Sequence, residues 1–206
     1  MIYDISRPVT EEMAVYKNKT IKKPAFKWIA VYPEDNYNES NYKTNLHSGT
    51  HFDAPLHMVD GGGAVETLDL EDFLGPCRLL DLSFLERRIE AADLKDFEIK
   101  PGERIVIKTR NSFEDDYNPE FICLNPSAAE YLRDIGIRSL AIDAMSIERG
   151  DPEHRVHSII LGAGIGVLED VRLAEVPEGR YEIIALPLYL KGREAAPARA
   201  VLRTLD

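Results

Sequence analysis

Short apolar runs recur along the chain, and residues that favour turns separate them. Val, Ile, Leu, Phe and Tyr dominate these runs, whose length of about four to eight residues is typical of strands. The predicted strands span residues 2–6, 27–32, 76–82, 104–109, 139–143, 165–168, 181–187 and 198–204. The segment 33–45, rich in Asn, Tyr, Glu and Asp, is predicted to be a loop.

Three segments carry helix signals. Residues 67–73 are predicted as a short helix with Thr67 as its N-cap, and residues 91–97 as a second. The third begins at Asn125, the expected N-cap, which a proline follows, and it ends at Gly136. Helices are therefore expected to be fewer than strands.

Composition narrows the class of protein. Strands outnumber helices and some alternate with them, so the fold class is predicted as α/β (mixed α+β), in a single domain spanning residues 1–206. The hydrophobic fraction of 44% is enough for a sizeable core, and the net charge of −11 argues against a nucleic-acid partner.

No apolar run approaches the roughly 20 residues that span a bilayer, and residues 1–8 lack the pattern of a signal peptide. No membrane association and a cytoplasmic location are therefore expected. Cys77 and Cys123 lie far apart in sequence and in apolar surroundings, so they are predicted to be buried free thiols.

The chemistry concentrates in residues 46–57, which hold three of the five histidines. His47, His51, Asp53 and His57 all occupy odd positions, so a strand would direct them to one face. A fully extended strand would nevertheless separate His47 from His51 by about 13 Å. Because a metal ion holds its ligand atoms only about 2.0–2.2 Å away, a straight strand cannot bring them to one ion.

The local sequence predicts how these side chains converge. A helix would rotate Asp53 away from His47 and His51, and Pro55 disfavours a helix here. A turn around Gly49, which tolerates unusual backbone angles, can lead into a short extended run that Pro55 ends. This pattern predicts a metal cradle. Ordinary surface histidines, or a hydrogen-bonded core pair, are the alternatives that the same residues allow.

Residues 47–57 read His-x-Gly-Thr-His-x-Asp-x-Pro-x-His, which resembles the signature of the family described as Putative cyclase. That family includes bacterial kynurenine formamidase and, more distantly, isatin hydrolase. The similarity continues in residues 141–144, 157–169 and 197–202, so it covers essentially the whole chain. The resemblance implies a swivelling β/β/α fold with a central barrel-like mixed sheet.

The candidate ligands supply only nitrogen and oxygen atoms, a mixture that suits Zn²⁺ and tolerates Mn²⁺. The resemblance implies that His47, His51, Asp53 and Glu169 hold a first ion, and that Asp53, His157 and Glu169 hold a second. One or two Zn²⁺ ions per subunit are therefore expected, with Mn²⁺ as the alternative. His154 is a rival ligand that misses the family's spacing.

His57 is the expected proton-transfer residue, because imidazole titrates near neutral pH. A divalent ion would polarise the scissile carbonyl and lower the pKa of bound water towards ~7. With the resemblance, this predicts a metal-dependent amide hydrolase of the arylformamidase type. Its substrate would be N-formylkynurenine or a related aryl formamide, cleaved to formate and a free amine.

Aromatic residues give the last indications. Tyr16 stands where the family's formamidases carry a tryptophan, so it is the expected substrate-binding residue. Trp28, the only tryptophan, falls later and is a candidate for the core. Hydrolysis of a cyclic amide such as isatin, with Mn²⁺, and non-catalytic metal binding are the alternative functions. The partner is expected to be a small-molecule amide, and the resemblance suggests a homodimer or homotetramer.

Overall fold

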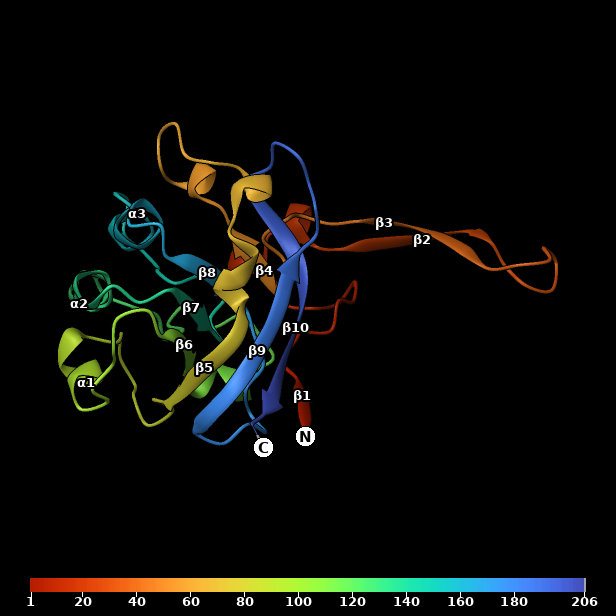
Figure 1. Cartoon of the computed structure of the whole chain (residues 1–206). Coiled ribbons are helices and arrows are strands. Elements are labelled where there is room, and N and C mark those ends of the chain that lie inside the picture. The colour runs from red at the N-terminus through yellow and green to blue at the C-terminus, as the bar shows by residue number, and fades with distance from the viewer. Residues whose placement is uncertain (206) are drawn as a thin grey trace.

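A closed barrel of mixed parallel and antiparallel strands forms the centre of the molecule (Figure 1). The structure is a computed structural model that describes residues 1–205. Its strands are β1 (Ile2–Asp4), β2 (Ala25–Ala30), β3 (Glu39–Lys43), β4 (His51–Asp53), β5 (Leu74–Asp81), β6 (Arg104–Lys108), β7 (Ser139–Ile142), β8 (Gly166–Glu169), β9 (Gly179–Pro187) and β10 (Ala195–Thr204). Its α-helices are α1 (Ala91–Lys95), α2 (Pro126–Ile135) and α3 (Arg155–Gly162).

The barrel closes through β10. Within residues 1–205 the sheet order is β1-β10-β4-β8-β7-β6-β5-β9, and β9 pairs again with β10. Strands β5, β6, β7 and β8 run parallel to one another, whereas the pairings that involve β4, β9 and β10 are antiparallel. The predicted mixed α/β class with a barrel-like sheet is therefore confirmed.

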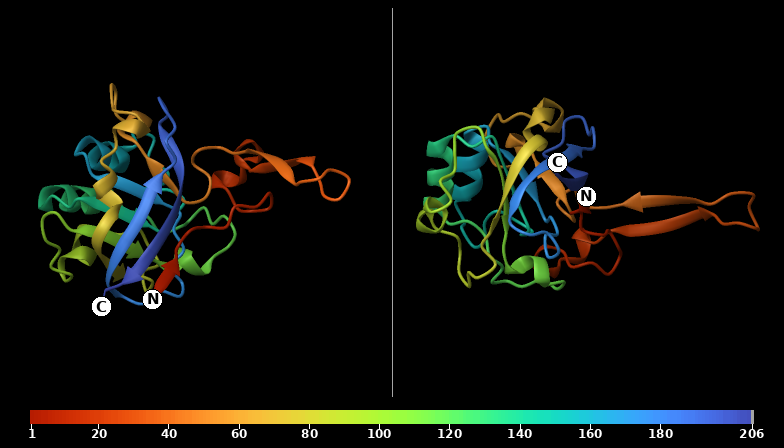
Figure 2. Two further views of the ribbon diagram at one scale, coloured as in Figure 1. Left: turned by 45° about the vertical axis from the view of Figure 1, so that its right-hand side comes forward. Right: turned by 60° about the horizontal axis from the view of Figure 1, so that its bottom comes forward.

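Alternation along the parallel strands separates an inner from an outer core. Val106 and Ala141 belong to the cluster inside the barrel, with Phe52 and Leu168. Their sequence neighbours, such as Ile105, belong to the cluster that also contains the buried residues of the three helices. Since side chains alternate along a strand, one face fills the barrel and the other packs against the helices. Figure 2 shows the helices gathered on one side of the barrel.

Helix α2 has the ends that the sequence predicts. The side chain of Asn125 accepts a hydrogen bond from the backbone N–H of Ala128, and Gly136 ends the helix with a φ of 77°. The prediction for residues 67–73 is wrong in kind. Two short 3₁₀ turns occupy this region, Val65–Thr67 and Leu70–Phe73, and Asp69 rather than Thr67 caps the second. A segment this short between two strands gains too few backbone hydrogen bonds to propagate an α-helix.

The predicted loop 33–45 is wrong in part, because it contains β3. Strands β2 and β3 pair antiparallel as a hairpin that projects from the barrel (Figures 1 and 2). Trp28, a candidate for the core in the sequence, is 64% exposed on this hairpin. The prediction that Trp28 belongs to the core is therefore also wrong. We call β2, β3 and their connection, residues 25–43, the arm.

The remaining findings concern helix α3, the two cysteines and the length of the helices. The sequence indicated no helix at α3, whose N-cap position His154 adopts a left-handed φ of 50° instead of offering a polar cap. Cys77 and Cys123 are free and buried, as predicted. No helix within residues 1–205 combines the length and hydropathy that crossing a membrane requires.

Candidate metal centre

The histidine-rich segment folds as its local sequence predicts. Gly49 occupies the turn with a φ of 76°, a conformation that favours glycine, and β4 follows directly. On β4, His51 and Asp53 share one face, while Phe52 points the other way into the barrel core. Pro55 then begins a 3₁₀ turn that ends at His57. The cradle therefore lies on the outer face of the sheet.

Barrel closure brings Glu169 to the same face. Glu169 ends β8 and is the direct cross-strand partner of His51. The Nε2 atom of His51 lies 3.3 Å from Glu169 Oε2 and 3.5 Å from Asp53 Oδ1. All three side chains are almost completely buried.

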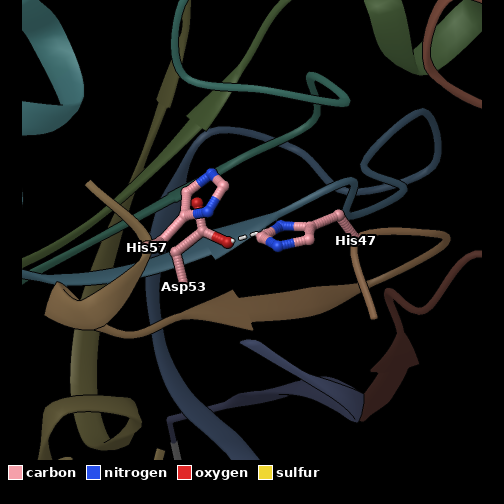
Figure 3. A group of neighbouring side chains, drawn as sticks. All are labelled: His47, Asp53 and His57. Atoms are coloured by element: carbon pink, nitrogen blue, oxygen red, sulfur yellow. Dashed lines mark ion pairs between the residues drawn. The ribbon is translucent and has the colours of Figure 1, made fainter. Parts of the chain in front are cut away.

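Two more histidines complete the group. His47, from the turn before β4, places Nδ1 3.0 Å from Asp53 Oδ1 (Figure 3). His157, from α3, places Nε2 3.5 Å from Asp53 Oδ2 and 3.4 Å from Glu169 Oε1. The structure thus brings together all five residues proposed as metal ligands. It does not by itself assign their roles, which stay predictions.

The donor atoms of this group fit a cation. Within residues 1–205, His51 Nε2 and both carboxylate oxygens of Asp53 are buried without a hydrogen-bond partner. Buried polar atoms are normally hydrogen-bonded, so unpartnered atoms that converge on one point call for an additional group. The ligand atoms of His51, Asp53 and Glu169 lie within 4.8 Å of one another, which leaves room for a divalent ion between them.

Charge interactions within the group are strong. Burial alone would lower the pKa of His51, but Asp53 and Glu169 outweigh it and raise this pKa to about 10. Burial would raise the pKa of Asp53, yet the imidazoles of His157, His47 and His51 hold it well below its ordinary value. The site therefore keeps an ionised carboxylate in a buried position, which is the state that binds metal.

His57 lies beside the group, with its ring centroid 4.2 Å from that of His47 and 5.6 Å from that of His157. A ring nitrogen of His57 lies within 4.8 Å of the potential ligand atoms of His47 and Asp53 (Figure 3). The geometry therefore permits His57 to bind a metal as well as to transfer a proton. Burial lowers the pKa of His57 below its ordinary 6.5. A neutral imidazole at the edge of the group can accept a proton.

A cavity of about 170 Å³ opens onto these residues. His47, His57, His157 and Glu169 line one part of it, and Tyr16 lines another. The Tyr16 ring makes edge contacts with Tyr117 and Phe121, at centroid distances of 6.0 and 6.2 Å, which fix its position. The proposed substrate-binding tyrosine therefore faces the same space as the candidate ligands.

Glu148 is a site residue that the sequence did not reveal. It is buried on the wall of the cavity, and its Oε1 atom lies 3.1 Å from Nδ1 of His157. His154, the rival ligand, places Nδ1 2.6 Å from the same oxygen and is half exposed. It joins Glu148 rather than the pair formed by Asp53 and Glu169. Nothing in the spacing marked Glu148, because it stands in a loop between β7 and α3.

Comparison with known proteins decides the family. The sequence profile described as Putative cyclase matches residues 3–149. A kynurenine formamidase of Salinibacter ruber is 34% identical over 207 residues, which cover 98% of this chain and 97% of the relative. The chain belongs to the Putative cyclase family.

Solved structures share the cyclase fold. A predicted metal-dependent hydrolase from Bacillus stearothermophilus superposes with a TM-score of 0.89 at 44% identity, covering 98% of this chain and 97% of that one. Isatin hydrolase A from Labrenzia aggregata superposes with a TM-score of 0.85 at 20% identity, over 98% and 93% of the two chains, and shows the same fold. The resemblance drawn from the histidine-rich segment is thus confirmed at the level of family and fold.

Proposed function

We propose that residues 1–206 form one metal-dependent amide hydrolase domain of the arylformamidase type, acting on N-formylkynurenine or a related aryl formamide. The observation that carries this proposal is the set of buried, unpartnered atoms of His51 and Asp53, which lie against Glu169 and His157 on the wall of a cavity. Full-length similarity to kynurenine formamidases supports the reaction class. The products are formate and a free aryl amine.

His47, His51, Asp53, His157 and Glu169 would hold one or two divalent ions, Zn²⁺ first and Mn²⁺ as the alternative. When bound, such an ion supplies Lewis acidity to the scissile carbonyl and to water. Asp53 approaches three histidines and Glu169 approaches two of them, so their carboxylates fix the spacing of the imidazoles. Their burial excludes competing solvent ligands from the inner face of the site.

His57 would move the proton. It lines the cavity, so its ring can reach a water molecule held there and return the proton to the leaving amine. Tyr16 would bind the aryl ring of the substrate by edge or face contacts. A site that served only to staple the fold would need neither an open cavity nor an imidazole at its edge.

Elemental analysis and assays with and without a chelator test the proposal. We expect bound Zn²⁺ or Mn²⁺, hydrolysis of N-formylkynurenine, and loss of that activity on chelation. His57→Ala should retain the metal while activity falls about 100-fold or more. Glu153→Gln, which changes an exposed residue that does not line the cavity, serves as the control and should keep most activity. Turnover of isatin alone would favour the cyclic-amide alternative. A metal-loaded protein that hydrolyses neither N-formylkynurenine nor isatin would favour a purely structural metal site.

We also propose that the chain forms a homodimer through the arm, with a tetramer built from such dimers as the alternative. An isolated two-stranded hairpin is marginally stable, yet this one exposes Trp28, Phe26 and Tyr42. Residues 16–31 contain five lysines and no acidic residue, in a chain whose net charge is −11. A second copy offers the acidic surface that such a segment complements.

Sedimentation measurements on Trp28→Glu test this assembly, with Phe84→Glu as the control at an exposed aromatic between β5 and α1. We expect the first variant to sediment as a monomer and the second like the native protein. Native protein that sediments as a monomer would contradict the proposal. A cytoplasmic location stays a prediction from the sequence.

A further inference from the structure

Lys22 forms part of the wall of the cavity that His47, His157 and Glu169 also line. It ends the 3₁₀ turn Thr20–Lys22, and its backbone carbonyl accepts a hydrogen bond of 2.8 Å from the hydroxyl of Ser48. Ser48 belongs to the turn that leads into β4. The histidine-rich segment therefore fixes the backbone of Lys22, and the side chain reaches the same cavity as His47 and His57.

Within the described part of the chain, the ammonium group of Lys22 has no ionic partner. Among residues 1–205, no carboxylate lies within 4.0 Å of its Nζ atom. Arg149 lines the same cavity, but its guanidinium donates to the carbonyl of Phe121 at 2.9 Å and pairs with Glu120 at 2.8 Å. Burial, with a smaller contribution from Lys19, lowers the pKa of Lys22. Among the described residues, Lys22 is thus a half-buried cation without a carboxylate partner.

Lys22 and Tyr16 share one wall. The Nζ atom lies 5.5 Å from the centroid of the Tyr16 ring. The ring offers an apolar surface for an aryl group, and the ammonium lies beside it with free hydrogen-bond donors. A ligand that places an aryl ring against Tyr16 would bring any substituent on that ring within reach of the lysine.

We propose that Lys22 selects substrates that carry a carboxylate on or near the aryl ring that bears the scissile amide. The inference rests on the proposed amide hydrolase function and names its substrate class. A carboxylate gives the unpaired ammonium a charge-assisted hydrogen bond, which is about twice as strong as a neutral one. A neutral amide leaves the half-buried cation unpaired and gains nothing from it.

A matched pair of substrates tests the proposal on the metal-loaded protein. Formanilide is neutral, whereas 2-formamidobenzoate carries a carboxylate beside the same amide. We expect the ratio of kcat/KM for 2-formamidobenzoate to kcat/KM for formanilide to fall about tenfold or more in Lys22→Met, through KM. Lys22→Arg should restore much of the ratio, because it keeps the charge. Taking a ratio cancels differences in metal loading between variants.

Lys17→Met is the control. The Nζ atom of Lys17 lies 5.2 Å from the same Tyr16 ring, but Lys17 is exposed and does not line the cavity. It should retain the ratio of the native protein. An equal fall in Lys17→Met and Lys22→Met would show a general charge effect and overturn the proposal, as would an unchanged ratio in Lys22→Met.

Calorimetric binding of 2-aminobenzoate separates this inference from the hydrolase function. We expect Lys22→Met to bind this carboxylate about tenfold more weakly than the native protein. If neither these formamides nor N-formylkynurenine are hydrolysed but this difference is found, the hydrolase function fails and the carboxylate site stands. Equal binding by the two proteins would overturn the role of Lys22, whether or not the formamides are hydrolysed.

Discussion

Glu148 lies outside the set of candidate ligands but contacts one of them, His157, and can orient its ring. Its carboxylate lies between the side chains of His154 and His157. It also accepts hydrogen bonds from the backbone N–H groups of Val156 and His157 at the start of α3. Burial would raise the pKa of Glu148, but His157 above all lowers it, so an ionised oxygen faces Nδ1 of that ring. This contact favours the tautomer that leaves Nε2 free for a metal.

We therefore predict that Glu148→Gln weakens metal binding by about 10–100-fold, the range usual for residues that orient a ligand. Competition with a chromophoric chelator measures this directly. Glu153→Gln removes an exposed carboxylate from the same loop and should bind metal like the native protein. Equal affinities for the native protein and Glu148→Gln would rule out the orienting role.

The two cysteines lend themselves to a chemical test. Burial raises the pKa of Cys77 to about 12 and that of Cys123 to about 11. At pH 8 the reactive thiolate of either residue is then a fraction of about 0.1% or less. We predict that Ellman's reagent modifies neither thiol within minutes in the native protein at pH 8, and both in urea. Rapid reaction of the native protein would show that one thiol is accessible.

At the scale of elements, sequence patterns were informative where local and tertiary preferences agree. The cap at Asn125, the end of the helix at Gly136 and the short apolar strands all emerge in the structure as predicted. Helix α3 lacks a polar cap side chain, because His154 fills that position, and Glu148 from the preceding loop accepts the hydrogen bond of the Val156 N–H instead. Strand β3 is polar and fully exposed, so no hydrophobic alternation marked it.

Some residues of the candidate site could be predicted from the sequence, and others could not. Four of them, His47, His51, Asp53 and His57, lie within eleven residues. Their spacing was sufficient to predict the turn and the short strand β4. Glu169 could be placed only through the family resemblance, because its contact with His51 arises from the pairing of β4 with β8. Glu148 and Lys22 reach the cavity from segments whose sequence carries no signal of their own.

The glycines after His57 permit a test of the 3₁₀ turn that carries it. A Cβ atom on Gly62 would lie 2.5 Å from the backbone carbon of Pro55, whereas one on Gly61 would meet nothing within 4 Å. We predict that Gly62→Ala displaces the turn Pro55–His57, costs about 2 kcal/mol of unfolding free energy and lowers kcat/KM at least tenfold. Urea unfolding and formamide assays provide the two measurements.

Gly61→Ala is the matched control for this prediction. Gly61 has a φ of 68°, so alanine there should cost about 1 kcal/mol through backbone strain while leaving His57 in place. Its kcat/KM should stay close to that of the native protein. Two variants with the same activity would show that the close approach of Gly62 to Pro55 has no bearing on the site.

For the whole molecule, barrel closure is the step that assembles the centre. Strand β4 lies between β8 and β10, and β10 also pairs with β9, so the pairing that seats His51 beside Glu169 belongs to the closed sheet. The two buried carboxylates of Asp53 and Glu169 repel each other in this arrangement. Without an ion, protonated His51 offsets part of that repulsion, because its pKa is raised to about 10.

Metal binding should therefore stabilise the whole fold by a measurable but limited amount. At a free metal concentration about 100 times Kd, binding to the native state alone contributes about 2.7 kcal/mol. For a chain of this size that corresponds to an increase in Tm of roughly 5–10 °C, which chelation should reverse. Calorimetric scans of the metal-loaded and chelated protein measure the shift. Asp53→Asn should abolish it, because Asp53 contacts three histidines of the site. Asp81→Asn, on β5 away from the site, should keep it. Transitions that coincide with and without metal in the native protein would mean that the cradle binds no ion in the folded state.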